Sequence, residues 1–301
     1  MIHDDISTAA QLACLLEASA PNPGNVSPGR HFRDARYEEF LASAAAIGPS
    51  LARAGERPLG VTVREAVEAT TRWARSNTNL GIVLLLAPLA RARLLPGPPP
   101  ASREALRGAL ERVLAATTVA DARDVYAAIR RAAPGGLGRS AEQDVAEEPS
   151  VTLLDAMRLA GSRDGVAREY ASLFRATFEV GAPALERARR DGLPWDDAVV
   201  EAYLTLLASS PDTHVARRAG AERAATISRR AGAVLEAGGV RSERGRAAVS
   251  ALDDELRDGD NSGNPGTTAD LTAASIFVVL LDGGWHSIHG STQGSFDAAT
   301  R

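Results

Sequence analysis

Polar residues that could bind a metal or a phosphate are concentrated at four places, each just before an apolar run. The richest is the stretch DELRDGDNSGNPGTTADLTAASIF near the end of the chain. Thr267 with Asp270 three residues later approximates a capping box, which needs no function. Capping leaves Asp258, Asp260 and Asn264 unexplained. Oxygen donors in a glycine-rich loop suit Mg²⁺ or a phosphate.

The second place is APNPGNVSPGRHFRDARYEEF, where Asn25 lies in a Pro-Gly turn before a run of acids. Asp34 and Glu38 are four residues apart, which would put both carboxylates on one helical face if the helix starts early enough. Such a pair can hold Mg²⁺ through oxygen ligands. The alternative is a capped helix with solvated acids in its first turn, where the helix dipole favours them.

The third place is RSNTNLGIVLLLAPLA, where Asn77 and Asn79 precede the most apolar run of the chain. Capping explains one polar residue at a helix start, but not the whole Asn-Thr-Asn sequence. The free N–H groups at a buried helix start can also bind a phosphate, and Gly81 would allow the phosphate to approach the backbone closely.

The fourth place is SSPDTHVARRAG, in which Asp212 or the following threonine can cap a long helix. Helical spacing places His214 beside both Arg217 and Arg218. An aspartate, a histidine that titrates near neutral pH and two guanidinium forks could serve a polyphosphate and an acid–base step. The alternative is an arginine-rich exposed helix face.

The elements that must position these residues are helices. The apolar content is 45% but the aromatic content is only 4%, which favours close-packed helices rich in Ala, Leu and Val. Helical periodicity recurs along the chain, whereas strand-like alternation is nearly absent, so the expected fold is all-α. Helices are predicted over residues 4–19, 37–54, 62–75, 80–94, 102–117, 120–132, 163–190, 195–208, 213–237, 243–257 and 268–281.

A single helical domain over residues 1–282 is expected, with a mobile tail over 283–301. The segments 94–102 and 133–150 are rich in Pro, Gly or polar residues without a period, which indicates surface connectors. They could mark domain boundaries, but the polar clusters lie on both sides of them. We therefore expect one domain, with a site built from loops and helix N-termini.

Composition excludes several classes of function. The net charge is −4, with the charges interspersed, which argues against a nucleic-acid partner. The chain contains no lysine, so phosphate binding must rely on arginine forks, backbone N–H groups or a metal. The single cysteine and the absence of a basic leader indicate a cytoplasmic protein. The longest apolar run, over residues 81–90, is too short for a membrane span, and a homo-oligomer stays open.

Taken together, PNPGNV, NTNLGIVLLLAPLA, PDTHVARRAG and NPGTTADLTAASIF resemble the signature set of the ATP:dephospho-CoA triphosphoribosyl transferase family, also called triphosphoribosyl-dephospho-CoA synthases. The resemblance extends from about Asn22 to about Leu281 and is specific as a set. Asn22 stands where the lyase-associated enzymes have a Pro-Lys-Pro-Gly type motif, and Asn79 and Leu80 stand where they have a His-Lys pair. The chain is therefore similar to a divergent, synthase-like branch, and its acceptor stays open.

The resemblance implies an all-α enzyme that moves the 5-triphosphoribosyl group of ATP to the ribose 2′-hydroxyl of 3′-dephospho-CoA, or of a related acceptor, and releases adenine. The product is the precursor of the prosthetic group of acyl carrier subunits. Such a reaction needs stabilisation of positive charge at C1′, a base for the attacking hydroxyl and an acid or hydrogen bond for adenine. Mg²⁺ would clamp the intact triphosphate.

The resemblance also suggests roles for the four clusters, with the positive end of the last predicted helix pointing at the triphosphate. The candidates are, as catalytic groups, His214 as acid or base together with Asp212 and Glu38, the last two also as further metal ligands; for substrate and phosphate, Asn25, Asn77, Asn79, Arg217, Asn264 and Thr268; and for the metal, Asp34, Asp258, Asp260 and Asp270.

Two other functions remain open at the level of the sequence. The first is an all-α, Mg²⁺-dependent nucleotide hydrolase, which would need paired carboxylates along facing helices and which the Asn-rich motifs fit less well. The second is a non-catalytic nucleotide- or CoA-binding protein of the same fold. Tight ATP binding without any product would distinguish it.

Overall fold

The computed structural model describes residues 3–258 and 260–285, and within these ranges the chain is all-α, as predicted. An isolated bridge between Ser27 and Arg30 is the only strand-like pairing in the described residues. The helices are α1 (His3–Ser19), α2 (Tyr37–Ala52), α3 (Leu59–Thr70), α4 (Leu80–Arg93), α5 (Arg103–Ala115), α6 (Val119–Ala132), α7 (Leu153–Ala160), α8 (Gly165–Ala171), the π-helical η1 (Thr177–Gly181), α9 (Ala182–Arg190), α10 (Trp195–Ser209), α11 (Thr213–Ala219), α12 (Ala221–Glu236), the 3₁₀ turn η2 (Gly239–Arg241), α13 (Glu243–Leu256) and α14 (Gly266–Leu281).

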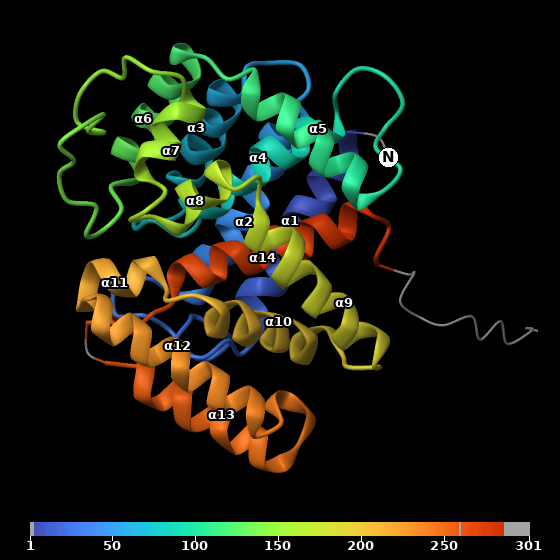
Figure 1. Cartoon of the computed structure of the whole chain (residues 1–301), viewed down its shortest axis with the longest axis vertical. Coiled ribbons are helices and arrows are strands. Elements are labelled where there is room, and N and C mark those ends of the chain that lie inside the picture. Colours follow the sequence, from blue (N-terminus) through green and yellow to red (C-terminus); the bar gives the residue numbers. More distant parts are fainter. Residues whose placement is uncertain (1–2, 259, 286–301) are drawn as a thin grey trace, which may run out of the picture.

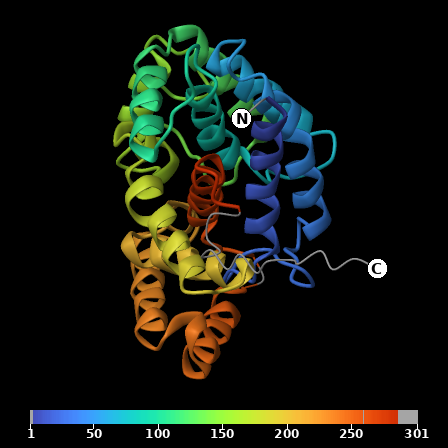
Figure 2. The same cartoon turned by 90° about the vertical axis from the view of Figure 1, so that its right-hand side faces the viewer.

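Helix α14 runs through the middle of the molecule. It packs against α1, α4, α9 and α10, and Figures 1 and 2 show it between the group α2–α8 and the group α9–α13. Nearly every residue of α14 from Thr267 to Leu281 is buried. A helix that is apolar on all sides is stable only inside a protein, which explains its central place.

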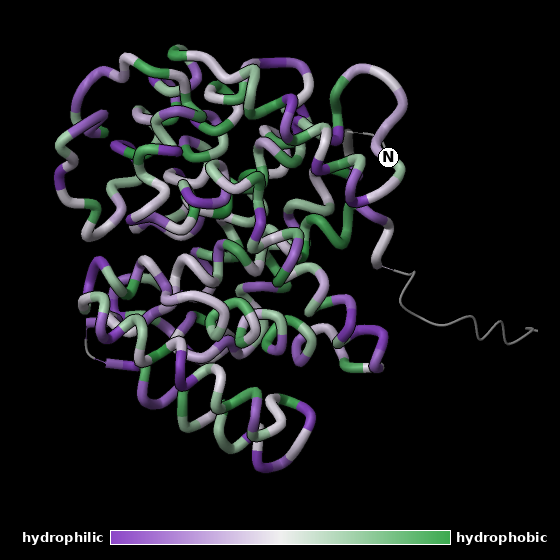
Figure 3. The backbone as a smooth tube through the Cα atoms, viewed as in Figure 1, coloured by the Kyte–Doolittle hydropathy of each residue, from purple (hydrophilic) through white to green (hydrophobic). Residues whose placement is uncertain are grey.

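Helix α4 is the second central element. Its residues from Ile82 to Ala90 are buried without interruption, and it packs against α3, α5 and α14. Figure 3 shows apolar residues gathered toward the middle of the molecule and hydrophilic residues along the outer loops. Because α4 and α14 are both interior, polar groups at their first turns lie inside the protein.

The predicted helix over residues 163–190 is interrupted, and the prediction of one continuous helix was wrong there. Leu173 and Phe174 have φ of 55° and 56°, which a helix cannot accommodate. The buried carboxylate of Glu169 accepts hydrogen bonds from the backbone N–H groups of Ala176 and Thr177, at 2.9 and 2.8 Å. These bonds start a new helical segment at the break.

Two further differences concern residues near the site. The predicted helix over 213–237 divides at Gly220, whose φ is 91°, so α11 and α12 are separate. Helix α7 was not predicted; Thr152 caps it by accepting from Asp155 N at 3.2 Å. Most of the predicted tail, residues 286–301, lies outside the described residues. No helix in the described ranges is both long and apolar enough to cross a membrane.

Candidate active site

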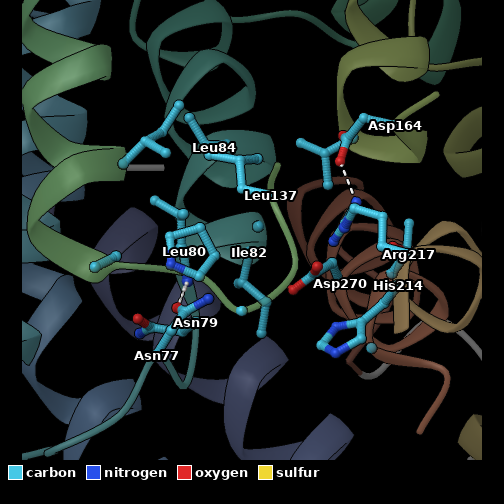
Figure 4. Close-up of a pocket in the computed structure, with 18 of the residues that line it drawn as sticks. Asn77, Asn79, Leu80, Ile82, Leu84, Leu137, Asp164, His214, Arg217 and Asp270 are labelled. Atoms are coloured by element: carbon cyan, nitrogen blue, oxygen red, sulfur yellow. Dashed lines mark hydrogen bonds and ion pairs between the residues drawn. The ribbon is translucent and has the colours of Figure 1, made fainter. Parts of the chain in front are cut away.

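A cavity of about 550 Å³ opens where α4, α6, α7, α8, α11 and the first turns of α14 meet (Figure 4). It brings together residues from all four polar places of the sequence. Of the candidates from the sequence, those that line it are Asn25, Asp34, Asn77, Asn79, His214, Arg217, Asn264 and Asp270. Those that do not are Glu38, Asp212, Asp258, Asp260 and Thr268.

Asp258 and Asp260, which were predicted as metal ligands, do not line the cavity. Asp258 closes its own turn, because its carboxylate accepts from Asp260 N at 3.2 Å and from Ser262 N at 2.8 Å, and from the Ser262 hydroxyl. Burial opposes ionisation of Asp258, but these hydrogen bonds prevail and lower its pKa. Asp260 is exposed and its carbonyl accepts from Arg218 at 2.6 Å. The polar turn is thus largely self-contained.

Asp212, a predicted catalytic group, and Thr268, a predicted phosphate ligand, are hydrogen-bonded to each other. One carboxylate oxygen of Asp212 accepts from the backbone N–H groups of His214 and Val215, at 2.7 and 3.0 Å. The other accepts from the N–H and the hydroxyl of Thr268, both at 2.7 Å. Asp212 therefore caps α11 and ties the start of α14 to it, which leaves this buried carboxylate no free lone pair for a metal.

Asp34 and Glu38 do not form the predicted pair on one helical face, because α2 begins only at Tyr37. Asp34 lies in the preceding bend, where it is exposed and still lines the cavity. Glu38 is exposed in the first turn of α2 beside Arg36, with 3.4 Å between Oε2 and Nε. The alternative interpretation from the sequence, solvated acids in a first helical turn, describes Glu38 correctly.

The first turn of α4 is close to another helix, but the group that approaches it is not a phosphate. A Cβ added at Gly81 would lie 2.8 Å from Oδ1 of Asp270 and closer still to Oδ2. Asn77 Oδ1 accepts from Leu80 N at 3.0 Å and so caps the helix. The first turn of α4, where the sequence predicted a bound phosphate, is therefore occupied by the carboxyl group of Asp270.

Glu17 is a cavity residue that sequence reasoning missed. It lies on α1, is only 2% exposed, and its Oε1 accepts from the side-chain amides of Asn22 and Asn25 at 3.1 and 2.8 Å. Burial raises the pKa of Glu17 to about 8, although these two hydrogen bonds lower it. A signal was present, because Glu17 is the only charged residue between Asp5 and Arg30.

Asp164 was also missed, because a helix N-cap carries no functional signal in a sequence. Its Oδ1 accepts from Ala167 N at 2.9 Å and caps α8, while Oδ2 accepts from Arg217 at 2.6 Å (Figure 4). The ion pair holds the guanidinium of Arg217 against the cavity. Thr213 joins the same region by accepting from Gly165 N at 2.9 Å.

Several buried polar atoms that line the cavity have no hydrogen-bond partner. They are Nδ2 of Asn79, Nε2 of His214, Nε of Arg217, Oδ1 of Asn264 and the hydroxyl of Ser76. Buried polar groups are nearly always paired, so a cluster of unpaired donors and acceptors around one cavity indicates the place of a polar ligand. This ligand must offer both donors and acceptors.

The ionisation states of the lining residues follow from their burial. Burial raises the pKa of Asp270 well above its usual range, and the negative charge of Glu17 raises it further, while Arg217 lowers it. Burial lowers the pKa of His214; Asp212 raises it, and the charges of Arg217 and Arg218 lower it again. His214 is therefore a neutral imidazole near pH 7.

The segment that joins α6 to α7 forms part of the cavity wall. Leu137 lines the cavity from this segment, as Figure 4 shows, with 39% of its surface exposed. The segment is anchored where Tyr126 donates to the carbonyl of Gln143 at 2.7 Å. A Cβ at Gly136 would lie 3.6 Å from Cβ of Arg217, so the segment reaches across to α11. The sequence predicted only a surface connector here.

A magnesium site made by the protein alone does not fit these residues, since the described ranges contain no group of three or more His, Cys, Asp or Glu side chains that could hold a metal. Oxygen donors do line the cavity. Asp270 lines the cavity, and Oδ1 of Asn264 is unpartnered. Mg²⁺ commonly uses one or two protein oxygens together with substrate phosphates, and Asp270 with Asn264 fits that mode.

Comparison with known proteins agrees with this geometry. The model of the ATP:dephospho-CoA triphosphoribosyl transferase family matches residues 3–288. A protein of Stutzerimonas stutzeri named as a probable 2-(5″-triphosphoribosyl)-3′-dephosphocoenzyme-A synthase is 41% identical over 116 residues, which cover 38% of this chain and 39% of that protein. A protein of the same name from Pseudomonas syringae pv. tomato is 39% identical over 117 residues, covering 38% and 40%. The matched segment thus spans about two fifths of these curated relatives.

A solved structure extends the similarity over most of the chain. The crystal structure of a protein from Archaeoglobus fulgidus, assigned as a triphosphoribosyl-dephospho-CoA synthase, superposes with a TM-score of 0.63 at 31% sequence identity. It covers 81% of this chain and 99% of that one. The family model and this structure lead to one conclusion: the chain belongs to the ATP:dephospho-CoA triphosphoribosyl transferase family.

Proposed function

We propose that the chain is a transferase that moves the triphosphoribosyl group of ATP to the ribose 2′-hydroxyl of 3′-dephospho-CoA, or of a related acceptor, with release of adenine. Membership of the family supports the substrates. One structural observation carries the proposal: unpartnered buried polar atoms surround one cavity, and Asn79, His214, Arg217 and Asn264 supply them. A ribose with phosphates offers both the donors and the acceptors that these atoms need.

Glu17 is the residue best suited to take the proton of the attacking hydroxyl. Its Oε1 is held by Asn22 and Asn25, and it lines the cavity, so its position is fixed by the fold. Burial raises its pKa to about 8, which matches the ideal for a general base near neutral pH. In the transfer, the C1′–N9 bond breaks, its electron pair goes to adenine, and the acceptor oxygen forms the new bond to C1′ as its proton passes to Glu17.

His214 and the carboxylates can stabilise the other parts of the reaction. Burial keeps His214 neutral, so that it can hydrogen-bond the leaving purine or a ribose hydroxyl without adding charge. Positive charge develops at C1′ in a glycosyl transfer, and preorganised carboxylates beside it lower the barrier. Asp270 and Glu17 both line the cavity, and neither forms an ion pair with an arginine in the described residues.

Mg²⁺ stays a proposal. When bound, it would neutralise the triphosphate, and the side chains that would hold it are Asp270 and Asn264. The hydrolase alternative would need paired carboxylates along facing helices, and membership of the transferase family does not favour it. The cytoplasmic location and a homo-oligomeric state stay predictions from the sequence.

The deciding experiment incubates the purified chain with ATP, Mg²⁺ and 3′-dephospho-CoA and separates the products by chromatography. We expect free adenine and a CoA adduct in equal amounts. Adenine without an adduct would mean that the glycosyl chemistry is right and the acceptor is wrong. ADP, AMP or phosphate as the only products would replace the transferase with a hydrolase, and ATP binding without any product would support the binding-protein alternative.

A further inference from the structure

We infer that the arginines at one end of the cavity bind the triphosphate of the nucleotide, and that Arg163 and Arg218 act there together with Arg217. This inference rests on the proposed function. It adds Arg163, which the sequence did not select for binding, and it fixes the direction in which the nucleotide lies. The ligand class of this end is a linear polyphosphate.

The three guanidinium groups come from two elements but line the same cavity. Arg163 lies in the turn before α8, and Arg217 and Arg218 lie on α11. Asp164 holds Arg217 at 2.6 Å, and the carbonyl of Asp260 accepts from Arg218 at 2.6 Å. These bonds orient the two α11 side chains without using up their donors, because each guanidinium has five N–H groups.

The protein balances the charges at this end only in part, since Asp144 lies near enough to Arg163 for the two charges to interact. Asp164 pairs with Arg217, but neither Arg163 nor Arg218 forms an ion pair with a carboxylate in the described residues. Nε of Arg217 and Nε2 of His214 are buried without a partner. His214, Arg217 and Arg218 all line the cavity, and the charges of both α11 arginines act on His214. A polyphosphate supplies the negative charge and the acceptors that are missing there.

The first turn of α4 is a poor place for a phosphate. It already faces the side chain of Asp270, which packs against Gly81 and occupies the place that an anion would take there. The triphosphate is thereby directed toward α11, and the ribose inward toward Asp270 and Glu17. Arg75 lines the cavity on the α4 side and is the alternative arginine for binding the triphosphate.

Calorimetric titration of the ligand-free chain with inorganic tripolyphosphate tests the inference without turnover. The double variant Arg163→Gln with Arg218→Gln should bind about tenfold to a hundredfold more weakly than the unmodified chain, through lost charge-assisted hydrogen bonds. Both side chains are exposed, so folding should be unaffected. The matched control is Arg229→Gln, an exposed arginine of α12 outside the cavity lining, which should bind like the unmodified chain.

Unchanged tripolyphosphate affinity in the double variant would overturn the inference, and so would a loss of binding in Arg75→Gln alone. The adenine-release assay separates this inference from the proposed function. If the unmodified chain releases adenine and the double variant keeps the same KM for ATP, the inference fails and the transferase stands. If no adenine forms but tripolyphosphate binding depends on Arg163 and Arg218, the polyphosphate site stands and the transferase proposal fails.

Discussion

The carboxylate of Asp270 packs directly on Gly81, so that a Cβ at Gly81 would lie 2.8 Å from Oδ1 and closer to Oδ2. This contact joins the first turns of the two interior helices, α4 and α14. It puts a carboxyl group at the positive end of α4. The glycine therefore determines where a carboxylate of the cavity can be placed.

Replacing Gly81 by alanine should displace Asp270 and lower kcat/KM for adenine release by about a hundredfold, since a misplacement of about 1 Å can cost this much. Gly232→Ala is the matched control, because Gly232 lies within α12 with no heavy atom within 4 Å of an added Cβ. That control should keep full activity and gain about 0.5–1 kcal/mol in the free energy of unfolding. Normal activity of Gly81→Ala would contradict the role given to the contact.

Glu17 should make the stability of the ligand-free chain fall as pH rises. Its folded-state pKa of about 8 lies above the ordinary value of 4.5, so the folded state binds the proton more tightly than the unfolded state does. The stabilisation is complete below pH 4.5 and is lost as pH rises to about 8. Asp270, whose pKa is also raised, acts in the same direction.

Urea unfolding at pH 5 and pH 8 measures this effect by comparison with Glu17→Gln, which keeps an oxygen to accept from Asn22 and Asn25. The stability difference between the two proteins should change by an amount on the order of 3 to 5 kcal/mol over this range, in favour of the variant at high pH. Parallel pH profiles for the two proteins would show that Glu17 titrates normally.

Asp212 should matter for stability, whereas Asp260 should matter for neither stability nor turnover. Asp212→Ala removes the acceptor for four donors at the starts of α11 and α14. We expect a loss of about 2 to 4 kcal/mol in the free energy of unfolding, measured by denaturant titration. Asp260→Ala should stay within about 0.5 kcal/mol. A stable Asp212→Ala protein that lacks only activity would restore the catalytic assignment.

Leu137 should protect the reacting centre from water. Leu137→Ala opens the wall between the α6–α7 segment and the cavity, so water can replace the acceptor hydroxyl at C1′ and give ribose triphosphate. The ratio of adenine to CoA adduct should rise above one, as chromatography of both products can show. Leu159→Ala, at an exposed leucine of α7 on the same cavity, tests whether any loss of apolar lining has this effect. An adenine-to-adduct ratio of one in Leu137→Ala would contradict the shielding role of Leu137.

Magnesium should act only together with the nucleotide, because the described residues hold no cluster of three or more metal-ligating side chains. EDTA should leave the Tm of the ligand-free chain unchanged, and Mg²⁺ alone should not raise it. ATP with Mg²⁺ should raise Tm, by mass action on the folded state, and Asp270→Asn should reduce this shift. A rise of several degrees with Mg²⁺ alone would reveal a metal site made by the protein itself.

The local features of the chain were predictable where short-range rules apply. The apolar runs over 80–94 and 268–281 predicted interior helices, and α4 and α14 confirm them within about two residues. The breaks inside 163–190 and 213–237 were not predictable. The break inside 163–190 depends on the side chain of Glu169, which accepts a backbone hydrogen bond at the start of the next segment. The break inside 213–237 depends on the positive φ of Gly220.

The sequence by itself determined the all-α class, the family and the polar clusters at helix starts, because periodicity, capping and motif order are properties of consecutive residues. Only the tertiary structure decided which polar groups share the cavity. Residues far apart in the chain, such as Glu17 and Asp164, line the same cavity. The carboxylates of Asp212 and Asp258 instead accept hydrogen bonds from backbone N–H groups nearby. The physical reason is that a carboxylate is satisfied by whatever donors the folded backbone brings within reach, and spacing along the chain does not specify those donors.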